Sequence, residues 1–117
     1  MPITVASKDS GLTIPLSGEI DHHAARDMMA QLDQAIAERV PARLTLDLSG
    51  VTFMDSSGIA VLLRALRQME RHGGSLRAAH IPAQARRVLD AAGGQAIRLF
   101  AKIENLDGVE KLGELLP

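Results

Sequence analysis

Residues 53–58 read Phe-Met-Asp-Ser-Ser-Gly and separate two segments of opposite periodicity. Before them, leucines alternate with polar residues over 44–49, which is typical of a strand with one buried face. After them, apolar residues recur at helical spacing from Ile59 to Met69. The chain is therefore predicted to turn from strand into helix on a small polar loop. Because a helix N-terminus presents unpaired N–H groups and the positive end of the helix dipole, a serine there is well placed to carry or contact a phosphate.

The composition excludes several classes of function. The chain has 117 residues, a length that suits one domain, and we expect residues 1–117 to form it. With 2% aromatic residues and a net charge of -1, it offers neither a stacking platform nor a basic stripe, so we expect no nucleic-acid partner. Cysteine is absent, which excludes disulfides, thiol catalysis and Cys-ligated zinc.

The sequence gives no indication of a membrane protein. No stretch approaches the roughly 20 apolar residues that a membrane-spanning helix needs. The N-terminus lacks the basic and hydrophobic regions of a secretory signal. We therefore expect a soluble, cytoplasmic protein.

Strand and helix patterns alternate along the chain. A hairpin is predicted from two strands, 3–6 and 12–16, around a loop of turn-forming residues, and Pro15 suggests a sheet edge or a bulge. The predicted fold class is α/β, with a mixed sheet of about five strands in which the hairpin precedes parallel strands, and about four helices mainly on one face. The remaining expected elements are a helix ending at Pro41, strand 44–48, helix 57–71 stopped by two glycines, strand 75–80, a helix from Pro82 stopped at 93–94, strand 97–100 and a terminal helix over 106–116.

The two serines have a structural and a functional interpretation. In the structural one, Asp55, Ser56 or Ser57 caps the following helix. One cap is enough for one helix, so if Asp55 or Ser56 caps, the Ser57 hydroxyl is left spare in the first turn. Beside Gly58, which has no side chain to block approach, that hydroxyl is an accessible acceptor for a phosphate.

A second polar segment precedes the first predicted helix. Asp21 is a candidate N-cap of that helix, and this structural role is compatible with a functional one. Adjacent histidines on a helix point about 100° apart and chelate one ion poorly, so His22 and His23 do not predict a metal site. One of these histidines paired with Ser57 would suggest a hydrolase, but the Gly-x-Ser-x-Gly motif is missing.

Other side chains on the second predicted helix could serve a partner. Arg64, Arg67 and Arg71 line what we expect to be its outer face, either as a solvated surface or as a basic strip that meets an acidic protein. One of Ile59 and Ala60 could form an exposed apolar contact. The glycine pairs at 73–74 and 93–94 lack the spacing of a phosphate-binding loop, so we expect no cofactor.

Two segments resemble signature segments of a known family. Residues 18–23, Gly-Glu-Ile-Asp-His-His, and 53–59, Phe-Met-Asp-Ser-Ser-Gly-Ile, are similar to those of bacterial anti-sigma factor antagonists, the STAS-domain proteins. The Asp-His-His run narrows the resemblance to the sporulation type that acts on anti-sigma F. The order of predicted elements also matches, from about residue 3 to residue 113.

The resemblance implies a function in transcription regulation by partner switching. The unphosphorylated protein would bind an anti-sigma factor that is also a serine kinase and so release the sigma factor. That kinase would phosphorylate Ser57 and switch the protein off, and a metal-dependent serine phosphatase would restore it. The partner surface is then expected to comprise Asp21, His22, Asp55, Ser56, Ser57, Gly58 and Ile59.

Two other readings stay open. A STAS module of a stress-response or transporter-regulating complex would share the fold and differ in its partner. A serine hydrolase that uses Ser57 as its nucleophile is the enzymatic alternative. The resemblance favours a protein-binding module with no catalysis, metal or cofactor of its own.

Overall fold

The computed structural model describes residues 4–5, 11–92 and 103–105. One mixed sheet contains its strands in the order β1-β2-β3-β4-β5. β1 runs antiparallel to β2, and each later strand is parallel to its neighbour, as the hairpin and crossover patterns predict. The strands are β1 (Thr4–Val5), β2 (Gly11–Ile20), β3 (Arg43–Met54), β4 (Ser75–Ala79) and β5 (Ile103–Asn105).

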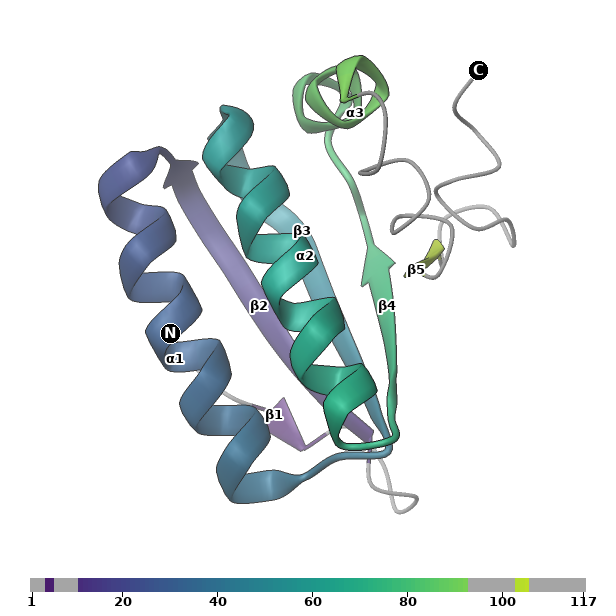
Figure 1. Ribbon diagram of the computed structural model, residues 1–117. Coiled ribbons are helices and arrows are strands. Elements are labelled where there is room, and N and C mark those ends of the chain that lie inside the picture. Colours follow the sequence, from purple (N-terminus) through teal and green to yellow (C-terminus); the bar gives the residue numbers. More distant parts are fainter. Residues whose placement is uncertain (1–3, 6–10, 93–102, 106–117) are drawn as a thin grey trace.

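The described part of the chain holds three helices, α1 (His22–Arg39), α2 (Ser56–Arg71) and α3 (Ala83–Ala91). α1 and α2 lie side by side over one face of the sheet, and α3 lies near the carboxyl ends of the parallel strands (Figure 1). Because α1 follows β2 and α2 follows β3, both helices begin at that same end of the sheet (Figure 1). This arrangement brings their first turns together.

The core between sheet and helices is aliphatic, as the scarcity of aromatic residues requires. The alternating leucines of β3 are fully buried on the helix-covered face. Periodic side chains of the two helices meet them there, which buries most of the apolar surface and supplies the main drive for folding. These side chains are Ala25, Met28, Leu32, Ala35 and Ile36 of α1, and Val61, Leu62, Ala65, Leu66 and Met69 of α2.

Element bounds differ from the prediction around residues 17–20, where β2 continues past the predicted end at Leu16, and around residues 49–56. β3 does not end at Leu48 but continues to Met54, because its second half pairs with the end of β2. α2 begins at Ser56, one residue before the predicted start, so a single residue, Asp55, separates strand from helix. The expected polar loop is therefore wrong, and both serines belong to the helix.

Pro15 lies within β2, opposite Asp47 of β3. The register of the two strands shifts between Pro15 and Ser17, so the predicted bulge is confirmed. The expected loop 7–10, glycine stop at 93–94, strand 97–100 and helix 106–116 lie outside the described residues. The strand that pairs with β4 is β5, at Ile103–Asn105.

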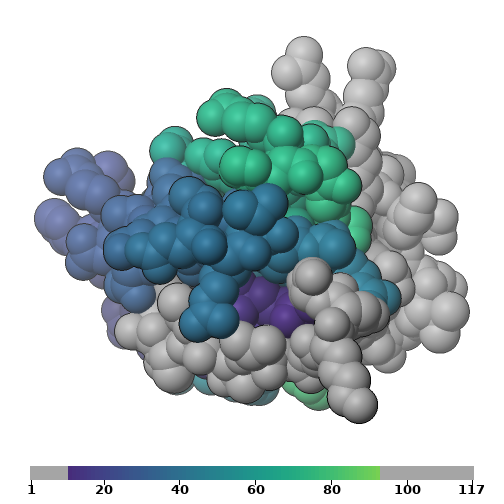
Figure 2. Space-filling model, turned by 90° about the horizontal axis from the view of Figure 1, so that it is seen from below, coloured from purple at the N-terminus to yellow at the C-terminus, as the bar shows by residue number. Residues whose placement is uncertain are grey.

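The connections at the opposite end of the sheet pack against each other. Seen from below in Figure 2, the chain that leaves α1 (blue) lies between the start of β2 (purple) and the turn after α2 (green). Ser75 donates its N–H to the carbonyl of Ala42 at 3.0 Å, which joins the two connections. The residue after α1, Val40, adopts the left-handed conformation at φ 42°. After α2 the left-handed residue is a glycine, Gly73, at φ 77°.

Candidate functional site

Two strand-to-helix turns lie next to each other at the carboxyl end of the sheet. Ile20 and Met54 are partners in the β2–β3 ladder, and each is followed by one aspartate and then a helix. The N–H of Asp55 donates to the carbonyl of Ile20 at 3.2 Å, which ties the second turn to the first. The two signature segments, 18–23 and 53–59, are therefore brought together by parallel strand pairing.

Asp21 is the N-cap of α1. Its Oδ1 accepts a hydrogen bond from the N–H of Ala24 at 2.9 Å. That bond is the main reason why the pKa of Asp21 lies below the ordinary value for an aspartate, and backbone N–H and charge interactions with His23 act in the same direction. A lowered pKa means that the stabilisation is complete above the unfolded-state pKa of about 4 and is lost only as pH falls through the folded value. Asp21 thus stays ionised at neutral pH.

Asp55 is the N-cap of α2. Its Oδ1 accepts from the N–H of Ser57 at 2.7 Å, and its backbone carbonyl accepts from the N–H of Gly58 at 3.0 Å. Of the candidate caps left open by the sequence, Asp55 is the one used. Ser57 therefore lies in the first helical turn, half-buried, and Ser56 beside it is exposed. No described residue forms a hydrogen bond with the Ser57 hydroxyl.

Gly58 is buried, which corrects the reason that the sequence suggested for it. A Cβ at this position would lie 2.3 Å from Cγ and 2.6 Å from Sδ of Met54. Met54 is itself fully buried, so its side chain could move aside only by displacing its packed neighbours. The glycine is needed so that α2 can approach the end of β3 closely, rather than to open the way to the Ser57 hydroxyl.

Gln84 of α3 binds the end of β3 on the side opposite β2, and no sequence pattern indicated this role. β3 pairs with β4 only from Arg43 to Asp47, so its last residues lack a strand partner on that side among the described residues. The Gln84 amide replaces that partner at Met54. Its Oε1 accepts from the Met54 N–H and its Nε2 donates to the Met54 carbonyl, both at 2.8 Å. A glutamine in a helix carries no sequence signal for such a contact.

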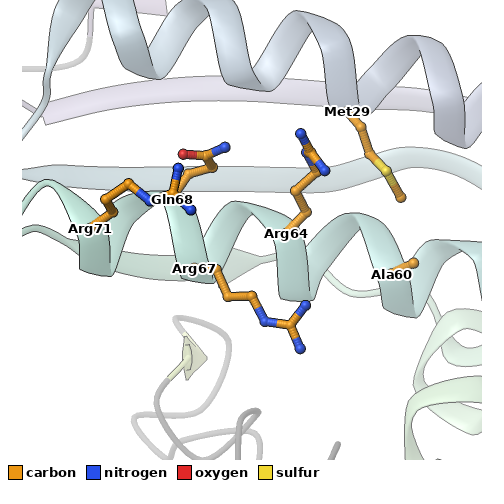
Figure 3. Close-up of a pocket in the computed structure, with 6 residues that line it drawn as sticks. All are labelled: Met29, Ala60, Arg64, Arg67, Gln68 and Arg71. Atoms are coloured by element: carbon orange, nitrogen blue, oxygen red, sulfur yellow. The ribbon is translucent and has the colours of Figure 1, made fainter.

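A groove runs between α1 and α2 from the mouth occupied by Ser57. We call it the α1–α2 groove. Its first part encloses about 240 Å³ and is lined by His22, Ala25, Arg26, Met29, Ser57 and Ala60. Its second part encloses about 420 Å³ and is lined by Met29, Ala60, Arg64, Arg67, Gln68 and Arg71 (Figure 3). The exposed apolar residue of the expected pair is thus Ala60, because Ile59 packs partly against the core.

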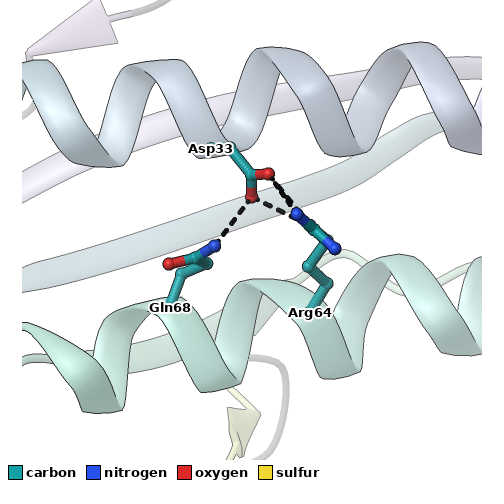
Figure 4. A network of polar contacts seen from close by, with 3 residues as sticks. All are labelled: Asp33, Arg64 and Gln68. Carbon is teal, nitrogen blue, oxygen red and sulfur yellow. Dashed lines mark hydrogen bonds and ion pairs between the residues drawn. The ribbon is translucent and has the colours of Figure 1, made fainter.

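The sequence suggested that the arginines of α2 share one outer face, but the structure places them in different environments. Arg64 points toward α1 and forms a bidentate ion pair with Asp33, with Nε to Oδ1 at 3.0 Å and Nη2 to Oδ2 at 2.6 Å (Figure 4). Gln68 donates to the same carboxylate at 3.3 Å. The hydrogen bond to Asp33 raises the pKa of Arg64 further. In contrast, Arg67 points away from α1, and no described residue pairs with it (Figure 3).

No cluster of three or more potential metal ligands occurs in the described part of the chain. The exposed rings of His22 and His23 instead contact each other edge to face, with centroids 5.7 Å apart. Within the same ranges, no helix has the length and apolar character needed to cross a bilayer.

The paired turns and the sheet with helices on one face define a STAS domain, and the chain belongs to that family. The family model described as "Mlab, STAS domain" matches residues 3–99. This finding confirms the family that the two signature segments predicted.

Among curated relatives, the chain is 35% identical over 82 residues to an anti-sigma F factor antagonist from Paenibacillus polymyxa, a match that covers 70% of each protein. Its structure resembles that of the anti-sigma factor antagonist SpoIIAA in its unphosphorylated form, with a TM-score of 0.59 and 26% identity over 74% of this chain and 79% of the other. The Bacillus cell fate determinant SpoIIAA in the phosphorylated form gives a TM-score of 0.62 at 24% identity, over 89% and 90% of the two chains, which shows the shared fold.

Proposed function

We propose that this protein is an anti-sigma factor antagonist of the partner-switching kind. In its unphosphorylated form it binds an anti-sigma factor, which is a serine kinase, and thereby releases the sigma factor. Phosphorylation at Ser57 ends this binding, and a serine phosphatase reverses the modification. The proposal puts the protein in the cytoplasm, where sigma factors act.

The position of the Ser57 side chain carries the proposal. Asp55 caps α2, so the Ser57 hydroxyl is not needed for that purpose. The residue is half-buried at the mouth of the α1–α2 groove, and its hydroxyl has no hydrogen bond with any described residue. A hydroxyl in this position can reach a kinase without unfolding the helix. The relationship to an anti-sigma F factor antagonist supports the same assignment.

The surrounding residues form the proposed partner surface. Asp21, His22 and Asp55 lie around Ser57 at the adjoining helix starts, and exposed Ser56 borders it. Gly58 and Ile59 contribute chiefly through the shape of the turn, because Gly58 is buried and Ile59 is partly covered. A protein kinase supplies its own catalytic base, so neither aspartate needs a catalytic role.

Reconstitution with the cognate anti-sigma kinase and ATP tests the modification site. Wild-type protein should gain one phosphate, and Ser57→Ala should gain none. Ser56→Ala is the matched control, because Ser56 is the neighbouring hydroxyl in the same helical turn, and this variant should still gain its phosphate at Ser57. Phosphate on the Ser57→Ala variant at the wild-type rate would remove the assignment.

The consequence of the modification is tested with Ser57→Asp. A phosphate adds about 1.5 to 2 negative charges, so we expect it to act at the binding surface, by bulk and by repulsion of acidic partner groups. The variant should lose binding to the anti-sigma factor in calorimetry and keep its thermal melting curve. A collapsed melting curve would show that the substitution acts through the fold instead.

The hydrolase alternative rests on one observation, that His22 lines the same groove as Ser57. No hydrogen bond joins the two side chains in the described structure. A serine-reactive phosphonate should therefore leave the protein unlabelled. Stoichiometric labelling of Ser57 that is lost in His22→Gln would support the hydrolase.

A further inference from the structure

A phosphate on Ser57 would meet a helix N-terminus at which two N–H groups are already occupied. The Ser57 N–H is held by the Asp55 carboxylate at 2.7 Å, and the Gly58 N–H by the Asp55 carbonyl. Phosphate would thus lie beside an existing negative charge rather than replace it in an empty anion site. Such a group needs cations from elsewhere to offset the repulsion.

The α1–α2 groove supplies those cations. Arg26 and His22 lie one helical turn apart on α1, and both line the part of the groove that Ser57 lines. Arg26 is exposed, and no described residue forms an ion pair or hydrogen bond with it. The next arginine along the groove, Arg64, is already engaged by Asp33. Arg26 is therefore the guanidinium at this end of the groove that remains available.

We propose that Arg26, assisted by His22, binds the phosphate of phosphorylated Ser57 within the same chain. This inference rests on the proposed function, since it assumes that Ser57 is the modified residue. An arginine fork matches two phosphate oxygens and makes short charge-assisted hydrogen bonds. The contact bridges α1 and α2 across the groove mouth, so phosphorylation both adds charge and closes the surface that the unmodified protein offers its partner.

The charged groups that face the phosphate are few. Among the described residues, the charged or titratable groups on the α1 side are Arg26, His22 and the capping carboxylate of Asp21, with which His23 interacts, and on the α2 side the carboxylate of Asp55. Both carboxylates raise the second pKa of the phosphate and Arg26 lowers it. Removal of Arg26 alone should therefore raise the second pKa of the phosphate.

The test uses protein with phosphoserine encoded at position 57, so that no kinase is required. Phosphorus NMR is used to follow the second ionisation of the phosphate, whose ordinary pKa is about 6, in wild type and in Arg26→Gln. We expect the wild-type value to lie lower by about half a unit, and the difference to shrink at high salt. Arg67→Gln is the matched control, because Arg67 is also an exposed arginine but lines the second part of the groove, which Ser57 does not line.

Equal phosphate pKa values in wild type and Arg26→Gln would overturn the proposal. An equal effect of Arg67→Gln would also overturn it, since a general field and not a specific contact would then be at work. The titration reads the charge beside the phosphate in folded protein, so a change in overall stability does not imitate it. Failure of the kinase assay, in contrast, would remove the proposed function and leave this measurement standing on its own.

Discussion

The two aspartate-capped turns are alike in plan and differ in how tightly they are packed. In each, a strand of the parallel pair ends, one aspartate caps, and a helix begins. At the third helical position, α1 has Ala24, which is partly exposed, and α2 has Gly58, which is buried against Met54. Only the second turn is also held by Gln84. The turn that carries Ser57 is therefore a rigid support, and the turn of α1 is a looser neighbour that contributes side chains.

The largest expected effect is at Gly58, where the two turns differ most. Gly58→Ala places a Cβ inside the Met54 side chain and should lower the free energy of unfolding by about 2–3 kcal/mol, the upper range for overpacking. The reverse change at the matched position, Ala24→Gly, should cost only about 0.5–1 kcal/mol through backbone entropy. Urea denaturation of both variants measures the difference.

A double variant sharpens this result. Met54→Ala removes the atoms with which the new Cβ collides, so Gly58→Ala combined with Met54→Ala should cost clearly less than the sum of the single changes. Strictly additive losses would show that the glycine is needed for another reason.

The next effect concerns the clamp that only the second turn has. Gln84→Leu leaves the N–H and carbonyl of Met54 without their partner, which should cost about 1–2 kcal/mol. Hydrogen exchange at the Met54 amide should accelerate with it. The control is Gln34→Leu, which removes an exposed bond to Glu38 within α1 and should cost about 0.2–0.5 kcal/mol. An unchanged Met54 exchange rate in Gln84→Leu would contradict the clamp.

A smaller effect is expected at the cap of α2. Asp55→Ala frees the Ser57 N–H and should destabilise the protein by about 1 kcal/mol, measured by thermal unfolding. Asp55→Asn keeps an oxygen acceptor and should retain most of the stability. If asparagine behaves like alanine, the carboxylate charge rather than the cap bond is what stabilises this turn.

Effects of similar or smaller size are expected at the far ends of the same two helices. Val40 adopts φ 42°, where a β-branched residue is strained, and its side chain is 51% exposed. Val40→Gly should therefore raise the free energy of unfolding by about 0.5–1 kcal/mol. At the corresponding end of α2, Gly73→Ala should lower it by about 1 kcal/mol, because Gly73 already has the left-handed conformation. Stabilisation by both changes, or by neither, would contradict this account of the helix ends.

The sequence predicted the elements well and the tight contacts poorly. Periodicity located both helices that cover the sheet, the alternation of strands and helices predicted the parallel order after the hairpin, and the proline indicated an edge or a bulge where the register shifts. It ended β3 six residues early, because the second half of that strand has no regular alternation and is fixed by pairing with β2. The sequence suggested the wrong reason for a glycine at position 58 and no role for Gln84. Both depend on contacts with atoms of Met54, which come close only after folding.

What the sequence determined by itself is local: approximately where each helix begins, which residues can cap it, and that two serines lie at the start of α2. Those features follow from backbone geometry and the spacing of polar and apolar residues. The tertiary structure alone decided that Asp55 and not a serine is the cap, that Arg64 turns to Asp33, and that Arg26 shares a groove with Ser57. The last two pairings join α1 to α2, so they depend on how the sheet sets the two helices side by side, which no local pattern encodes. The choice of cap is a local bond, but it follows from β3 continuing to Met54, which leaves Asp55 as the residue between strand and helix.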